Sequence, residues 1–416
     1  MNRTRVLLAL LLAATFAGGL ALAVPADPPA DTDDTRAHAV RELLDRRAGA
    51  VLARDEAAFT ADLDPAADPA FRQRQRDLFH NLAAVPLAGW EYRVDPTGTA
   101  VPDPPDADDA WAPGLSLAYR LRDVDVVPSV QPMAYLFTRR GDRWYLNSDT
   151  ALEAAGRHTW RGPWDFGPCH VLTGASGFVL SHPGGEALAA RVLAELDPAV
   201  AAVTEVWGPA WSRRVAVLVP AGTAEVRALV GPAFADSAIA GVAVADGVDH
   251  ATRTARGQRV VVNPASAEAL SPLALRVLLR HEITHVAARG ETADGAPMWL
   301  LEGFADYVGF RGDDVPPSLA APALAARVRT APPGGLPADD RFRGADLDLA
   351  YQEAWSFTRY LAQRFGEPAL VGAYRRIAGA GRVDDARLAA LVRAETGVEL
   401  AELVRDWRES LPAAFP

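Results

Sequence analysis

Lysine is absent from this sequence, and cysteine occurs only once, at position 169. A single cysteine excludes an intrachain disulfide, and we expect Cys169 to be a buried thiol without a catalytic role. All 42 basic residues are arginine, which we interpret, together with the abundant alanine, as the codon usage of a GC-rich genome. The 53 acidic residues leave a net charge of −11. This charge argues against a nucleic acid partner, because binding phosphates requires a basic surface.

Long apolar runs are also missing, with one exception at the start of the chain. Two arginines precede an apolar run over residues 6–20, and Ala21-Leu22-Ala23 follows as a small-x-small cleavage motif. This order is typical of export, so we expect residues 1–23 to be a signal peptide. The alternative is an uncleaved anchor, since the run is nearly long enough to cross a bilayer. Either way the rest of the chain lies outside the cytoplasm, secreted or membrane-anchored, and an uncleaved anchor would be its only membrane contact.

The N-terminal region has the pattern of one small α+β domain, over residues 35–152. A chain of 416 residues that is 50% hydrophobic has room for more than one such core. Helical periodicity comes first, and runs of period two follow. The predicted helices cover 37–59 and 70–82, and the predicted strands cover 90–94, 115–121, 133–137 and 144–146. The expected buried face of the first helix consists of Val40, Leu43, Leu44, Ala48, Val51 and Leu52. Two helices followed by an antiparallel sheet resemble the cystatin-like cone fold of the SnoaL-like group.

Residues 153–168 are rich in Gly, Pro and Trp, and we interpret them as a linker. A second domain is expected over residues 169–416. There strands and helices alternate at first, and helices then follow almost to the end of the chain. The predicted strands cover 171–172, 178–180, 215–219 and 259–262, and the first predicted helices cover 185–206, 224–230, 271–288 and 297–309.

An HExxH motif runs from His281 to His285 inside the predicted helix 271–288. Histidines at i and i+4 lie on one face of a helix, so both imidazoles can reach a single ion. Glu282 lies beside that face, where it can act as a general base toward a water molecule. A catalytic zinc site needs three protein ligands and an open position, so a third ligand must come from elsewhere.

The next predicted helix, 297–309, carries two acids at the same spacing, Glu302 and Asp306. The turn-rich segment 290–296 allows the two helices to fold back on each other. The acids interrupt an otherwise apolar run, where a carboxylate is costly unless it is paired or bound to a metal. This favours a metal site over a solvated helix face. We expect Glu302 to be the third ligand, and Asp306 to orient His281 through its far ring nitrogen.

These motifs resemble the gluzincins, and in particular the bacterial peptidase MA-like families. In those families HExxH is followed by a W-x-x-E-G-x-A-D block, which is matched here by Trp299, Glu302, Gly303, Ala305 and Asp306. The resemblance extends over roughly residues 170–410 and includes the segment 351–366. It implies a zincin-type domain with a mixed sheet, bound Zn²⁺ and hydrolysis of peptide bonds. It names no substrate.

Hydrolysis also needs a donor for the oxyanion, and related enzymes often take it from a later helix. The resemblance makes Tyr351 the candidate, because Tyr351 opens the helix that matches this part of the family. The alternative is that Tyr351 is an aromatic core residue near Trp355.

A metzincin arrangement would place the third ligand at Glu291, six residues after the second histidine. Metzincins need glycine at position 288 to turn the chain, whereas this sequence has Ala288. A helix that continues through Ala288 would carry Glu291 away from the ion, so Glu302 is the preferred ligand. The remaining histidines show no metal spacing, and we expect surface or structural roles for His38, His80, His158, His170, His182 and His250.

The sequence therefore predicts an α+β protein with a cone-like N-terminal domain and a gluzincin-type C-terminal domain. We expect an exported bacterial zinc metallopeptidase that acts on a peptide or protein. Zn²⁺ would be held by His281, His285 and Glu302, with Glu282 as the general base. The alternative is a catalytically silent binding or scaffold protein outside the cytoplasm, in which both domains serve recognition. Zinc analysis and cleavage of a peptide library distinguish the two, because a scaffold cleaves nothing.

Overall fold

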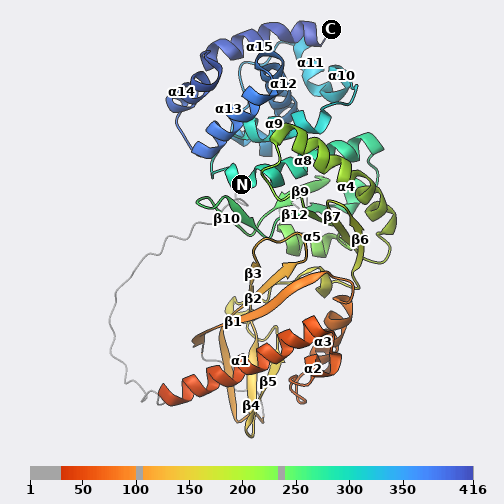
Figure 1. Cartoon of the computed structure of the whole chain (residues 1–416), viewed down its shortest axis with the longest axis vertical. Helices are drawn as coiled ribbons and strands as arrows, with labels where there is room; N and C mark the ends of the chain where they lie inside the picture. Colours follow the sequence, from red (N-terminus) through yellow and green to blue (C-terminus); the bar gives the residue numbers. More distant parts are fainter. Residues whose placement is uncertain (1–29, 100–105, 233–238, 416) are drawn as a thin grey trace. The chain divides into compact units, whose positions relative to one another are not determined.

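The computed structural model describes residues 30–99, 106–232 and 239–415 (Figure 1). The predicted signal segment, residues 1–23, lies outside them. No helix in the described part of the chain combines the length and apolarity needed to cross a membrane. The chain forms two compact units. Unit 1 contains the described residues up to 122, residues 128–169 and those within 221–238, and unit 2 contains 123–127, 170–220 and 239–415.

Unit 1 begins with three helices, α1 (Ala30–Ala53), α2 (Glu56–Thr60) and α3 (Pro69–Asn81). The prediction of one continuous helix over 37–59 is wrong, because the chain breaks between α1 and α2. Arg54 adopts a left-handed conformation with φ 58°, and its guanidinium donates to the carbonyl oxygens of Leu82 and Val85. Asp55 then caps α2 by accepting a hydrogen bond from the backbone N–H of Ala58.

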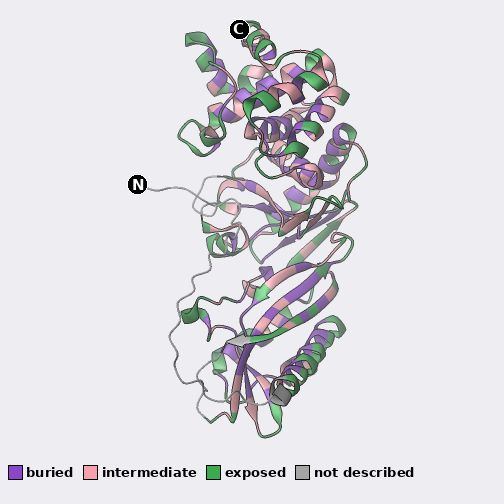
Figure 2. Cartoon of the chain, turned by 90° about the vertical axis from the view of Figure 1, so that its left-hand side faces the viewer, coloured by how far each residue is buried: buried purple, intermediate pink, exposed green. Residues whose placement is uncertain are grey.

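Helix α1 has one buried face, as the periodicity predicts (Figure 2). The helix packs on strand β1 (Leu87–Thr99). One member of the expected buried face is wrong: Leu52, at the end of the helix, is 47% exposed. Arg47 also lies on the buried side of α1, where no charged residue was expected. Its guanidinium lies over the ring of Phe59 and donates to Phe59 O and Gln75 Oε1, which offsets the cost of burial.

The sheet of unit 1 is antiparallel, with the order β1-β2-β4-β5 and with β3 beside β2. The long strand β2 pairs with β3 through residues 115–119 and with β4 through residues 109–111. The predicted single strand 133–137 is therefore wrong, since Met133 ends β3 and Leu136 begins β4. Trp160 and Trp164, from the segment expected to be a linker, pack on Tyr119 of this sheet. The further strands are β2 (Asp109–Leu121), β3 (Ser129–Met133), β4 (Leu136–Arg140) and β5 (Arg143–Ser148).

Unit 2 is built on a mixed five-stranded sheet, as predicted, with the order β6-β7-β8-β12-β9. β7, β8 and β12 run parallel, and the outer strands β6 and β9 are antiparallel to their neighbours. The long helices α4 (Glu186–Trp207) and α8 (Pro272–Ala288) share one hydrophobic core with the sheet valines 179, 217, 260 and 262. The strands are β6 (His170–Gly174), β7 (Gly177–Ser181), β8 (Val215–Leu218), β9 (Gly241–Val244) and β12 (Arg259–Val262).

The rest of unit 2 is mainly helical, as predicted. Helix α9 (Met298–Phe310) packs against both α8 and α12 (Leu347–Phe365). The other long helices are α11 (Pro322–Thr330), α13 (Glu367–Ala380), α14 (Asp385–Thr396) and α15 (Leu400–Ala414). Its shorter elements are β10 (Gly247–Asp249), β11 (Thr254–Arg256), α7 (Pro264–Ala267), η3 (Arg289–Glu291), α10 (Pro317–Ala320) and η4 (Asp339–Arg343). The short elements η1 (Glu153–Ala155), η2 (Pro163–Asp165) and α5 (Thr223–Val230) belong to unit 1.

The position of α9 depends on a close approach to α12 at Gly303. A Cβ atom added there would lie 2.5 Å from the carbonyl oxygen of Ala354 and 2.6 Å from Thr358 Oγ1. Only glycine fits at such a distance without a shift of one helix. On the other side, Arg280 of α8 donates to the carbonyl oxygens of Gly309 and Arg311 at the end of α9. α9 is thus fixed against both of its neighbours.

We predict that Gly303→Ala lowers the free energy of unfolding by about 1–3 kcal/mol, because the new methyl group overpacks the helix contact. The control is Gly49→Ala in α1, where nothing lies within 4 Å of an added Cβ. That variant should raise the free energy of unfolding by about 0.5–1 kcal/mol, since alanine is the better helix former. Thermal and urea unfolding measure the free energy of unfolding of both variants relative to the wild type. Equal effects of the two substitutions would contradict the close approach.

Candidate metal centre

Helix α8 carries the two histidines of the HExxH motif. Two residues favour the start of this helix. Ser271 is the N-cap and accepts a hydrogen bond from the N–H of Ala274, and Pro272 occupies the first turn. The apolar residues of α8 face the core, and His281 and His285 are half-buried on another face. Their ring centroids lie 4.8 Å apart, one helical turn from each other.

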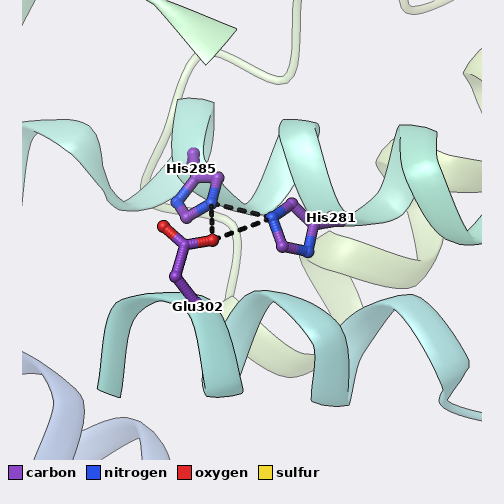
Figure 3. Close-up of side chains that lie close together, drawn as sticks. All are labelled: His281, His285 and Glu302. Carbon is purple, nitrogen blue, oxygen red and sulfur yellow. Dashed lines mark hydrogen bonds and ion pairs between the residues drawn. The ribbon is translucent and has the colours of Figure 1, made fainter. Parts of the chain in front are cut away.

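Helix α9 brings Glu302 to these rings, as Figure 3 shows. The distance from Glu302 Oε2 is 3.2 Å to His281 Nε2 and 3.5 Å to His285 Nε2, and the two nitrogens are 3.1 Å apart. Ligand atoms arranged tetrahedrally around Zn²⁺ are separated by about 3.3 Å, given bond lengths near 2.0–2.2 Å. The three atoms therefore fit one face of a zinc tetrahedron and leave a fourth position for water or substrate.

Asp306 fixes the orientation of His281. Its Oδ1 atom lies 2.7 Å from His281 Nδ1, which is the ring nitrogen turned away from Glu302. A proton on Nδ1 that is donated to Asp306 leaves the lone pair of Nε2 directed at the other two ligand atoms. The contact has the geometry expected for Asp306, and its effect on a bound metal stays a prediction.

The electrostatics of the site favour a bound cation. Burial raises the pKa of Glu302, but the two imidazoles outweigh it and hold the pKa well below its usual range. Burial lowers the pKa of His281, whereas the carboxylates of Asp306 and Glu302 together raise it well above its usual range. The site therefore holds ionised carboxylates beside two imidazoles. Zn²⁺ with neutral histidine ligands would balance the negative charge of these carboxylates.

Glu282 is buried beside the three ligands but does not belong to their cluster. Its Oε2 atom accepts a hydrogen bond of 2.7 Å from the N–H of Ala243 in strand β9. Burial raises the pKa of Glu282, and the neighbouring histidines oppose part of that rise. A raised pKa brings a carboxylate closer to the value that suits a general base.

Tyr351, near the start of α12, lies beside the histidines. Its ring centroid is 6.3 Å from that of His281 and 5.2 Å from that of Phe342. Burial, followed by the negative charges of Glu302 and Asp306, raises the pKa of Tyr351 well above its usual range. The hydroxyl therefore keeps its proton at neutral pH, and its hydrogen bond to Glu302 contributes to the same rise in pKa. The same contacts also fit the alternative, an aromatic packing residue.

Glu291 is not near the ligand atoms. It lies in η3, where its carboxylate pairs with Arg375 at 3.2 Å and with Arg253 at 3.9 Å. Among the described residues, the only group of three or more possible ligands consists of His281, His285 and Glu302. Cys169 is free and buried, and burial raises the pKa of its thiol to about 12, so it is a poor nucleophile.

Strand β9, whose Ala243 amide contacts Glu282, was not predicted from the sequence. The strand has four residues, and its apolar run Gly241-Val242-Ala243-Val244 resembles many alanine- and valine-rich stretches in this chain. One signal was available: Asp246-Gly247, a pair typical of turns, follows the run after Ala245. In the structure Gly247 begins β10, which pairs with β11.

Comparison with known proteins places the motifs inside a peptidase family match. The family model described as a peptidase of plants and bacteria matches residues 186–331, about a third of the chain. This stretch is similar to a peptidase family. It contains all three candidate ligands, Glu282 and Asp306, whereas Tyr351 lies beyond it. No curated protein matches the chain significantly.

Among solved structures, the chain is similar to an M1 zinc metallopeptidase from Deinococcus radiodurans, in two crystal structures. One is of a point mutant, with 13% identity and a TM-score of 0.34, covering 77% of this chain and 61% of that enzyme. The other has 15% identity and a TM-score of 0.37, with coverages of 78% and 62%. The chain therefore spans about three-fifths of the length of the enzyme it matches.

We predict that Glu302→Ala strongly reduces the zinc bound per chain, because two histidines alone leave the ion with half of a tetrahedral set. Elemental analysis after dialysis against a weak chelator measures the stoichiometry. Glu291→Ala is the matched control and should retain zinc at the wild-type level, since Glu291 pairs with arginines instead. The reverse result would move the third ligand to Glu291.

Proposed function

We propose that this protein is an exported zinc-dependent metallopeptidase. The observation that supports this most directly is the convergence of His281 Nε2, His285 Nε2 and Glu302 Oε2, at 3.1–3.5 Å, beside a buried acid. Such a set of two imidazoles and one carboxylate is the ligand chemistry of catalytic zinc in peptidases. The similarity of residues 186–331 to a peptidase family supports the same reaction class.

Zn²⁺ at this site would polarise the carbonyl of the scissile bond and lower the pKa of a water molecule. Glu282 is the residue that accepts a proton from the attacking water while the oxygen of that water bonds to the carbonyl carbon. When the carbon–nitrogen bond breaks, Glu282 delivers that proton to the leaving amine. Asp306 meanwhile holds His281 in the tautomer that keeps its Nε2 lone pair available.

Tyr351 would stabilise the negative charge that develops on the carbonyl oxygen. Its protonated hydroxyl, on a helix packed against α9, is a fixed donor in a partly buried place. The value of such a donor depends on its position, because it must lie within hydrogen-bond distance of the oxyanion.

The substrate backbone would lie extended along β9. β9 is the last strand of its sheet, and in the described residues it pairs only with β12. The N–H of Ala243 points to Glu282, so the free edge of β9 and the general base face the same space. A peptide added to this edge as a further strand would bring a peptide bond to Glu282. This supports a peptide or protein substrate in an extended conformation.

We predict that Glu282→Gln lowers kcat/KM on a peptide library by about 10²–10⁴-fold, because the amide cannot accept the proton of water. Bound zinc should remain at the wild-type stoichiometry. The control is Glu186→Gln, at an exposed residue that pairs with His170 in the first turn of α4. Wild-type turnover in Glu282→Gln would exclude the mechanism. A zinc-loaded wild-type protein that cleaves no peptide would instead favour the scaffold alternative.

We predict that Tyr351→Phe lowers kcat by about 10- to 1,000-fold and changes KM little, because only the hydroxyl is removed from the site. The phenylalanine ring keeps the contact with Phe342. An unchanged kcat would therefore identify Tyr351 as a packing residue, and steady-state kinetics on one cleaved peptide decides between the two roles.

A further inference from the structure

Helix α12 carries a buried acid two residues after Tyr351. The side chain of Glu353 is only 3% exposed and lies 2.5 Å from the guanidinium of Arg341. Burial raises the pKa of Glu353, and the nearby Arg341 and Arg327 oppose that rise. Neither residue of this ion pair belongs to the three-ligand cluster.

Arg341 is part of η4 (Asp339–Arg343), which contacts α9 and α12, two of the three helices that carry site residues. Asp339 Oδ1 accepts a hydrogen bond of 2.9 Å from the N–H of Met298, the first residue of α9. Phe342 is buried, and its ring packs edge-on against Tyr351 at 5.2 Å. η4 thus holds the start of the Glu302 helix, while consecutive side chains of η4 hold Tyr351 and Glu353 on α12.

Only the acid of this ion pair is buried, since the side chain of Arg341 is 31% exposed. Desolvation of the Glu353 carboxylate offsets part of the attraction, and solvent screens the guanidinium, so the pair contributes little to stability. What the pair does provide is direction, because a guanidinium and a carboxylate must meet in a defined geometry. Here the contact between Arg341 and Glu353 attaches η4 to α12, two residues along the helix from Tyr351.

We propose that Arg341 and Glu353 are positioning residues that set the place of the Tyr351 hydroxyl through Phe342. This inference rests on the proposed function, in which that hydroxyl binds the oxyanion. Without the ion pair η4 keeps its hydrogen bond to the start of α9 but loses its charged contact with α12, so Phe342 confines the Tyr351 ring against His281 less closely. A displaced donor still permits substrate binding but stabilises the transition state less.

The decisive variant replaces both charges with apolar residues of similar size, Arg341→Met together with Glu353→Leu. We expect the wild-type melting temperature and zinc stoichiometry, a KM within about two-fold, and a kcat lowered by about ten-fold. Arg341→Lys, which keeps the charge but not the planar fork, should lose less kcat than the double variant. If the double variant does not fold, the test rests on Arg341→Lys and its kcat. A folded double variant with the wild-type kcat overturns the proposal. If the double variant does not fold, a wild-type kcat in Arg341→Lys overturns it.

A double-mutant cycle with Tyr351→Phe identifies the route of the effect. If the ion pair acts through the Tyr351 hydroxyl, adding the double replacement to Tyr351→Phe lowers kcat no further. A full additional ten-fold loss overturns the proposal, because the ion pair then acts elsewhere. The control pair is Arg376 and Glu395, which joins α13 to α14 at 2.6 Å, and its replacement by Met and Leu should leave kcat unchanged.

The outcomes also separate this inference from the proposed function. If Tyr351→Phe leaves kcat unchanged while Glu282→Gln abolishes cleavage, the peptidase stands and the positioning role fails. If Glu282→Gln cleaves as well as the wild type, the proposed function itself fails.

Discussion

The meeting of the Glu302 carboxylate with two imidazoles is the interaction on which the candidate site depends. It requires α9 to lie close to α8, and two features outside the ligands enforce that. Arg280, the residue before the HExxH motif, binds carbonyl oxygens at the end of α9, and Gly303 allows α12 to press α9 from the other side. A buried carboxylate in this position is costly on its own. The packing of three helices therefore maintains an arrangement that a divalent cation would make favourable.

Much of the fold follows from local patterns. Helices α8 and α9 were predictable to within two residues of their observed ends, because α8 has a serine N-cap and α9 is a strongly apolar run that begins after Pro297. The i, i+4 spacing of the histidines and the acids also predicts that the two pairs face each other. The structure brings His281, His285 and Glu302 together in this way, with Asp306 on the far nitrogen of His281. One motif on each helix was enough to predict which side chains meet, because residues four apart lie on the same face of a helix.

The elements that could not be predicted depend on partners distant in sequence. The split of the segment 133–137 into two strands arises because β2 offers different halves of its length to β3 and β4. Arg47 is buried because Phe59 and Gln75 supply acceptors, which no helical periodicity reveals. The same holds for Glu353, whose partner Arg341 lies in a short element flanked by loops. In each case the deciding contact is tertiary and overrides the local pattern.

The hydrogen bond between Ala243 and Glu282 has a consequence for solubility. An unpaired strand edge is a template for association with another chain, and natural sheets reduce this hazard with short edges and nearby charges. β9 has only four residues, and one of its outward amide groups is occupied by a carboxylate of the same molecule. No residue of β9 is fully exposed, so its shortness, its partial burial and the carboxylate together reduce the risk of intermolecular β-pairing.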